Sequence, residues 1–187
     1  MPAELPFILR GQKIGIRRPS AADRDEFVAL AVASREFLRP WIDPPDTNER
    51  FDSYLRARQS PTDDGVLVCE LASGRIVGVI NINCIVRGLF QSAYLGYWIG
   101  AAFAHRGYMT EAMKLVVAHA FGEMGLHRLE ANIQPANVHS IALVRRCGFE
   151  KEGFSPKYLR IFGEWRDHER WAIRADSASV DRRETAG

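Results

Sequence analysis

The sequence predicts one mixed α/β domain built on a mostly antiparallel sheet that is flanked by helices. A chain of 187 residues is long enough for a single domain with a substantial core. Apolar segments joined by short turns predict an antiparallel meander in the first half, and a strand–helix–strand unit in the second half predicts a parallel crossover. We assign residues 1–175 to this domain and the small, polar and charged residues 176–187 to a flexible C-terminal tail.

The amino-terminal part contains a strand and two helices. Pro19 ends the first strand because proline lacks the N–H group that a sheet needs, and Ser20 directly after it is a typical helix N-cap. The elements expected here are a strand at residues 7–17, a helix at 21–35, a Pro-rich loop at 39–46 and a short helix at 47–58.

Apolar segments bounded by turn residues predict the rest of the sheet. Gly74 lies in a short turn between two of these segments, as expected for a hairpin. The strands are expected at residues 66–71, 76–86, 91–99, 128–133, 149–155 and 165–173, and two further helices are expected directly after residue 107 and at residues 138–147.

The stretch GYWIGAAFAHRGYMTEAMKLVVAHA, residues 96–120, runs from an apolar strand through a tight loop into an amphipathic helix. Gly107 lies just before the first helical turn, beside Arg106. Unpaired backbone N–H groups and the positive end of the helix dipole meet there, which suits a phosphate-bearing ligand. The stretch has neither GK[ST] nor GxGxxG, which argues against nucleotide hydrolysis and hydride transfer. It predicts a loop that holds a pyrophosphate; the alternative is a junction with no ligand.

The stretch LHRLEANIQPANVHSIALVRRCGFEKEG, residues 126–153, forms the predicted crossover. Pro135 ends the strand, and Asn137 is a good N-cap for the helix that follows. Gly148 is the helix stop expected at the C′ position. The pattern N-x-x-S therefore lies in the first turn of a helix that follows the loop described above.

These two stretches occur with other short motifs in a fixed order: FLRPW (37–41), LGYWI (95–99), RGYMTEA (106–112), GFEKEG (148–153) and GEWRDH (163–168). The ordered set covers nearly the whole chain and resembles the GNAT acyl-CoA-dependent N-acetyltransferases. Within them it is most similar to the RimJ/RimL type, the ribosomal-protein alanine N-acetyltransferases. One position departs from the family pattern Q-x-x-G-x-G, because His105 stands at the place of the first glycine. This predicts a tighter or differently tilted loop.

The resemblance implies a GNAT fold, whose sheet splays between its fourth and fifth strands, here residues 91–99 and 128–133. It also implies acetyl-CoA as cofactor, with its pantetheine arm in that gap. For Arg145 and Arg146 the alternative is a solvent-exposed helix face, and for Asn137 the alternative is a helix cap alone. The residues expected to bind the cofactor are Trp98, Ile99, Ala104, His105, Arg106, Gly107, Tyr108, Met109, Thr110, Asn137, Ser140, Arg145 and Arg146.

Acetyl transfer to an amine needs a proton acceptor for the amine, a donor for the developing oxyanion and a proton for the thiolate. No activated Ser or Cys stands out, so we expect direct transfer without a covalent enzyme intermediate. The resemblance places the hydroxyl of Ser140 near the CoA sulfur, as the acid. The alternative for Ser140 is a hydrogen bond back to the first-turn backbone.

The base is less well defined by the sequence. Glu130 is the candidate, because a carboxylate facing the substrate side of the gap would be desolvated and its pKa raised. An outward-facing carboxylate and a water-mediated deprotonation are the alternatives. Other relatives have a carboxylate near the position of Leu159, which has no ionisable group. Tyr158 is a candidate catalytic helper, and Tyr97 is a candidate for contact with the substrate. The alternative for both is aromatic packing.

Two further features border the expected site. Trp41, in the loop between the first two helices, is expected either to line the channel for the acceptor or to fill the space between helices. Asp167 and His168 form a possible dyad, but no Ser or Cys completes it, and we interpret the pair as structural.

Composition excludes several classes of protein. The chain has 25 basic and 23 acidic residues, so no electrostatic footprint for nucleic acid stands out. Its cysteines lack the spacing of a metal site or disulfide framework, so no metal is expected. Cys69, Cys84 and Cys147 are expected to be buried thiols. No apolar run is long enough to span a membrane and no leader is evident, which predicts a cytoplasmic protein.

The function expected is acetylation of a protein N-terminus, as in the ribosomal-protein alanine type. An α-amino group has a pKa of about 7.7–8.0 and a lysine about 10.4, so a weak base favours the α-amine. The first alternative is a small amine or antibiotic, for which Asp43, Asp46 and Glu49 offer some negative charge. The second is a non-catalytic acyl-CoA sensor. The acceptor and the choice between monomer and homodimer stay open.

Overall fold

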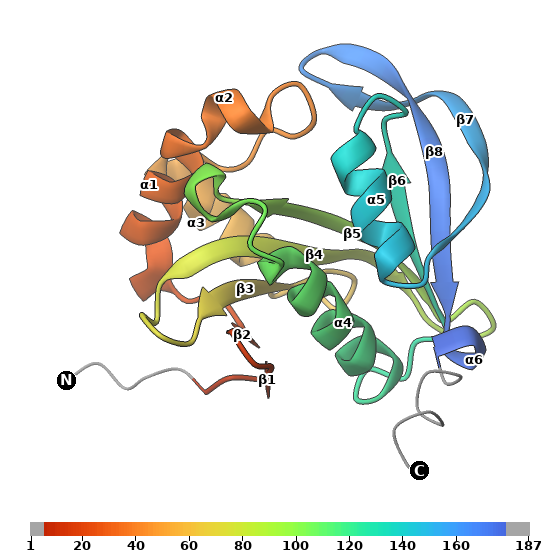
Figure 1. Cartoon of the computed structure of the whole chain (residues 1–187), viewed down its shortest axis with the longest axis horizontal. Coiled ribbons are helices and arrows are strands. Elements are labelled where there is room, and N and C mark those ends of the chain that lie inside the picture. The colour runs from red at the N-terminus through yellow and green to blue at the C-terminus, as the bar shows by residue number, and fades with distance from the viewer. Residues whose placement is uncertain (1–5, 179–187) are drawn as a thin grey trace.

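The computed structural model describes residues 6–178, which form an eight-stranded sheet in the order β1-β2-β3-β4-β5-β6-β8-β7 (Figure 1). All neighbouring strands are antiparallel except β5 and β6, which are parallel. The strands are β1 (Leu9–Arg10), β2 (Ile14–Arg17), β3 (Asp64–Glu70), β4 (Ile76–Val86), β5 (Ser92–Ile99), β6 (Arg128–Ile133), β7 (Glu150–Ile161) and β8 (Glu164–Arg174). The predicted fold class is confirmed.

Helices cover both faces of the sheet (Figure 1). On one face, apolar side chains of α4 (Tyr108–Phe121) and α5 (Val138–Arg146) pack against the sheet in the larger core, which includes the fully buried Met113, Val116 and Leu129. On the other face, α1 (Arg24–Ala33) and α3 (Asn48–Ala57) enclose a smaller aromatic core. The short helices are α2 (Arg35–Leu38), α6 (Ala175–Ala178) and two 3₁₀ turns, Ala21–Asp23 and Ala101–Phe103.

Two amino-terminal elements differ from prediction. The expected strand at residues 7–17 is a hairpin of β1 and β2, because the chain reverses at Gly11, whose N–H donates to the Ile14 carbonyl at 2.8 Å. The expected helix at 21–35 begins with a 3₁₀ turn and is interrupted at Ser34. The buried hydroxyl of Ser34 accepts a hydrogen bond from the N–H of Ala101 at 3.0 Å, which ties this break to the loop after β5.

The closing strands are longer than predicted, and β7 is irregular. The pairing of β7 with β8 shifts between Ser155 and Leu159, and Lys157 within this shift has a φ of +47°. Its N–H donates to the carboxylate of Asp167 on β8 at 2.8 Å, so Asp167 holds the irregular segment in place. The hairpin of β7 and β8 forms the end of the sheet next to β6 (Figure 1). Of the expected tail, residues 176–178 belong to α6, and residues 179–187 lie outside the described part of the chain.

The thiols follow the prediction at two of three positions. Cys69 and Cys147 are buried, and burial raises the pKa of each to about 11. Cys84 is exposed, which corrects the expectation for it, because β4 is irregular there and the residue has a φ of +52°. Within residues 6–178, no cluster of three or more His, Cys, Asp or Glu side chains is placed to hold a metal, and no helix has the length and apolarity to cross a membrane.

The sheet parts between β5 and β6, as the fold prediction requires. The two strands pair from Ser92 opposite Arg128 to Leu95 opposite Ala131. Beyond that point β5 continues along β4 as far as Ile99, and β6 continues along β8 as far as Ile133. Among the described residues, one edge of β5 at residues 96–99 therefore has no strand partner, and this open edge leads toward the start of α4.

Candidate active site

Two cavities, each of about 490 Å³, meet at the parted strands. We call the first the cradle cavity, because the loop before α4 and the first turn of α5 line it. We call the second the hairpin cavity, because β5, β6 and the β7–β8 hairpin line it. The residues that line both are Trp41, Ile42, Tyr97, Asn137 and Ser140. A ligand in one cavity can thus reach a ligand in the other at this junction.

The loop before α4 presents a row of free backbone donors. Among the described residues, the N–H groups of residues 105–110 donate to no other group, and the first helical bond runs from Glu111 to the Gly107 carbonyl at 3.1 Å. Gly107, the N-cap, has a φ of +81° and His105 a φ of +61°. His105 thus adopts the left-handed conformation that suits the glycine of the family pattern, at a cost of about 1–2 kcal/mol. Converging N–H groups at a helix N-terminus bind phosphate.

Cationic side chains lie beside this loop. Arg106, whose guanidinium lies 5.7 Å from the centre of the Phe103 ring, and Arg146 both line the cradle cavity. The rings of His105 and His139 lie 5.5 Å apart at the same cavity. Arg145, expected with Arg146, does not line this cavity. Its guanidinium instead lies 5.5 Å from the Trp171 ring, because neighbouring residues of a helix point in different directions.

Backbone direction along β5 distinguishes Trp98 from its neighbours. The N–H of Gly100 donates to Val77 of β4 at 2.8 Å, and the Gln91 carbonyl accepts from His127, just before β6, at 2.7 Å. Because amide direction alternates along an antiparallel strand, Tyr97 and Ile99 direct their amides into the gap, whereas the amide of Trp98 faces β4. Of the two residues expected to pair with pantetheine, Ile99 has the required direction. The buried Trp98 ring packs edge-on against Phe27 at 5.5 Å.

Ser140 and Tyr97 lie at the junction of the cavities, with their hydroxyl oxygens 2.7 Å apart. The side chain of Asn137, the N-cap of α5, accepts a hydrogen bond from the N–H of Ser140 at 3.2 Å and so fixes the first turn. Burial raises the pKa of Tyr97, and the hydrogen bond to Ser140 opposes that effect. The Ser140 side chain is therefore bonded across the gap to β5 instead of back to its own helix, which was the alternative for it.

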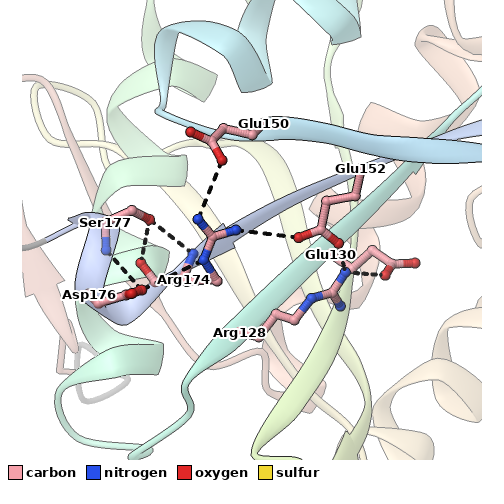
Figure 2. A network of polar contacts seen from close by, with 7 residues as sticks. All are labelled: Arg128, Glu130, Glu150, Glu152, Arg174, Asp176 and Ser177. Carbon is pink, nitrogen blue, oxygen red and sulfur yellow. Dashed lines mark hydrogen bonds and ion pairs between the residues drawn. The ribbon is translucent and has the colours of Figure 1, made fainter.

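Glu130 lies elsewhere than the sequence led us to expect. Its side chain is buried, lines neither cavity, and accepts a hydrogen bond from Arg128 at 2.7 Å (Figure 2). Arg128 also contacts Glu152 at 2.5 Å, and Arg174 links Glu152 and Glu150 into the same network. The carboxylate thus belongs to an ion-pair network between β6, β7 and β8, which corrects both its expected placement at the substrate side and the alternative of an outward-facing position.

Tyrosines and one histidine surround the hairpin cavity. Tyr158, a predicted catalytic helper, lines it together with Tyr94, and its ring lies 6.2 Å from the ring of His168. Tyr94 was missed by the sequence prediction, because residues three apart on a strand point to opposite faces and Tyr97 therefore gave no signal for it. The sequence indicates His168 only as one half of a dyad with Asp167. That dyad does not form, because the imidazole bonds the Arg166 carbonyl and Asp167 bonds Lys157.

Trp41 is half-buried and borders both cavities, so the structure favours the channel position over a plug between helices. In the loop that follows, Asp43 and Asp46 are both paired with Arg50, at 3.0 and 2.6 Å, and Asp46 also with Arg35 at 2.6 Å. These two carboxylates are thus neutralised locally and line neither cavity.

A loop of free amides beside two parted parallel strands, opening into a second cavity, defines the class of acyl-CoA-dependent transferases. The model of the acetyltransferase (GNAT) domain matches residues 13–150, and the chain belongs to this family. It is an acetyl-CoA-dependent acetyltransferase, as the sequence resemblance implied.

Named relatives agree with this family. The chain is 32% identical to a probable N-acetyltransferase, YjcK, of Bacillus subtilis, covering 89% of this chain and 96% of the relative. It is 35% identical to the [ribosomal protein uS5]-alanine N-acetyltransferase of Escherichia coli, covering 72% and 74%. Mycobacterium smegmatis RimJ, solved in complex with CoA-disulfide, superposes with a TM-score of 0.81 at 27% identity, covering 90% and 88%. The RimJ/RimL resemblance is thereby confirmed.

Proposed function

We propose that this acetyltransferase acetylates the α-amino group of a protein N-terminus by direct transfer. The observation that carries the proposal is the junction at Tyr97 and Ser140, where a cavity suited to a phosphate-bearing thioester meets a second, uncharged cavity. The relative named as a ribosomal-protein alanine N-acetyltransferase supports the same class of acceptor. Acetyl-CoA supplies the acetyl group activated as a thioester.

The residues of the cradle cavity fit acetyl-CoA. The free N–H groups of residues 105–110 would hold its pyrophosphate, as helix N-termini hold phosphates elsewhere, and Arg106 and Arg146 would neutralise its charge. The gap-facing amides of Tyr97 and Ile99 would pair with the pantetheine arm as a neighbouring strand would. The Ser140 hydroxyl, ordered by Tyr97, would donate a proton to the leaving sulfur.

The hairpin cavity favours a neutral peptide terminus over a polycation. Among the residues that the structure describes, no Asp, Glu, Lys or Arg side chain lines it, although amide side chains of Asn83, Asn132 and Gln134 do. Side-chain amides suit the hydrogen bonds of a peptide backbone, whereas a polyamine or an aminoglycoside calls for several carboxylates. The pairing of Asp43 and Asp46 with arginines reduces the negative charge that, together with Glu49, supported the small-amine alternative, and none of these three carboxylates lines the hairpin cavity.

The test is an acceptor panel at pH 7.5, with thiol release and mass spectrometry of the products as readouts. One peptide carries a free N-terminal alanine, a second has a blocked terminus and a free lysine, and the third acceptor is a polyamine. We expect acetylation of the first peptide at its terminus, because a sizeable minority of α-amines but only about one lysine in a thousand is neutral at this pH. Preferred acetylation of the polyamine or the lysine would refute the proposal.

A further inference from the structure

A buried histidine lines the hairpin cavity. His168, on β8, is 3% exposed and lines this cavity beside Tyr158. It lies beyond residues 13–150, the part of the chain that matches the family model. Its position follows from the pairing of β8 with the irregular part of β7, where Ser155 lies opposite His168.

The hydrogen bonding of His168 fixes which ring nitrogen carries the proton. Nδ1 lies 2.9 Å from the carbonyl oxygen of Arg166, and a carbonyl only accepts, so Nδ1 is the donor. In the neutral imidazole Nε2 then has the free lone pair. Within residues 6–178, no group forms a hydrogen bond with Nε2, and this atom is not fully buried. The lone pair is therefore accessible at the cavity.

Among the described groups around this cavity, His168 is the best candidate for a base. Within the described part of the chain, the other ionisable side chains that line it are Cys84, Tyr94, Tyr97 and Tyr158, and no carboxylate lines it. Glu130, the carboxylate on the adjacent strand, is bound to Arg128. Asp167, next to His168, accepts its hydrogen bond from Lys157. An imidazole is the side chain best suited to accept a proton near neutral pH.

We propose that His168 Nε2 accepts the proton of the acceptor amine, a role that rests on the proposed function. His168 takes one proton from the ammonium group, and the freed lone pair forms the new bond to the acetyl carbon. The carbon–sulfur bond breaks, and Ser140 supplies a proton to the leaving thiolate. The nitrogen loses its second proton to solvent, and His168 and Ser140 return to their starting states by proton exchange with water.

The burial of His168 also supports its assignment as the base. Desolvation lowers the pKa of His168, against opposing contributions from the Arg166 hydrogen bond and the Asp167 charge. The imidazole is thus neutral at pH 7.5 and ready to accept a proton. It is also a weak base, which matches an α-amine with a pKa of about 7.7–8.0 better than a lysine at about 10.4.

The test compares His168→Asn with a matched control, His127→Asn, in the full-length protein. Asparagine retains a donor near the position of Nδ1 and removes Nε2, whereas His127 is exposed and lines neither cavity. We expect His168→Asn to lower kcat/KM for the alanine peptide about 100-fold at pH 7. The deficit should shrink as pH rises above the pKa of the amine, because the peptide then arrives deprotonated. Coenzyme affinity and the unfolding temperature should not change.

Nitrogen NMR of the native protein gives a readout that is independent of activity. We expect the His168 resonances at pH 7.5 to show a protonated Nδ1 and an unprotonated Nε2. A proton on Nε2, or an equal deficit for His168→Asn at every pH, overturns the base assignment, as does a variant as active as His127→Asn. A native protein that acetylates none of the amines in the panel overturns the proposed function itself, and the base assignment with it.

Discussion

The hydroxyl oxygens of Tyr97 and Ser140 lie 2.7 Å apart and join β5 to the first turn of α5 across the parted strands. This hydrogen bond lies where the two cavities meet, so the same contact spans the gap and orders a proton donor. Burial raises the pKa of Tyr97, so this neighbour stays protonated as the hydrogen-bond partner of Ser140, while the Ser140 hydroxyl regains its proton from water after it has donated to the leaving sulfur.

The pair predicts a non-additive loss of activity. We expect Ser140→Ala to lower kcat at least 10-fold, with little change in coenzyme affinity, because the backbone amides that hold the coenzyme remain. Tyr97→Phe should lower kcat less, because Ser140 keeps its hydroxyl. In the double variant the losses should not multiply, since both side chains act through one hydrogen bond. Steady-state kinetics with acetyl-CoA and the alanine peptide checks this, and equal rates in Ser140→Ala would remove Ser140 from the mechanism.

Arg145 and Arg146 form a matched pair for testing the cradle cavity. Arg146 lines this cavity, whereas Arg145 lies over Trp171. We expect Arg146→Ala to weaken CoA binding about 5- to 20-fold in calorimetry at low salt, and the difference to decrease as salt screens the phosphate charge. Arg145→Ala should leave the affinity within about twofold. Equal effects from the two variants would contradict a specific role for Arg146.

His105 is a candidate for stabilisation by a single substitution. Its φ of +61° is a conformation that costs a non-glycine residue about 1–2 kcal/mol. Glycine loses more backbone entropy on folding, about 0.5–1 kcal/mol, so we expect His105→Gly to raise the free energy of unfolding by about 0.5–1 kcal/mol. Urea denaturation measures this change, and His105→Ala, which retains the strain, is the control. A destabilised glycine variant would show that the imidazole near His139 contributes more than the strain costs.

Substitution of Glu130 tests whether its carboxylate has a structural or a catalytic role. We expect Glu130→Gln to retain acetylation within about threefold, because the side chain lines neither cavity. The same change should lower the free energy of unfolding by about 1–3 kcal/mol, because it removes a charge from a buried ion pair with Arg128. Thermal unfolding and kinetics on the same preparation check both expectations. A stable variant with a large loss of kcat would restore Glu130 as a base candidate.

Much of the site was predictable because it is local in sequence. The cradle of residues 104–110 depends on one strand end, one left-handed glycine and one helix N-terminus, and the cap at Asn137 depends on three successive positions. The ion pair that occupies Glu130 was also foreseeable, since residues two apart on a strand share a face and Arg128 lies two residues earlier.

Other features required the whole molecule. The pairing of β7 with β8 contains a shift between Ser155 and Leu159, and sequence patterns do not fix such shifts. That register brings Tyr158 and His168 to the same cavity, which β5 completes with Tyr94.

The sequence by itself determined the fold family, the loop of free amides and the helix that carries Ser140, because hydrophobic period, caps and glycine conformation act over a few neighbouring residues. Only the tertiary structure decided which arginine faces the cradle cavity, which strand amides face the gap, and that His168 instead of Glu130 borders the second cavity. These outcomes depend on strand register and on ion pairs between segments far apart in the chain. Such contacts contribute free energy only once the sheet has assembled.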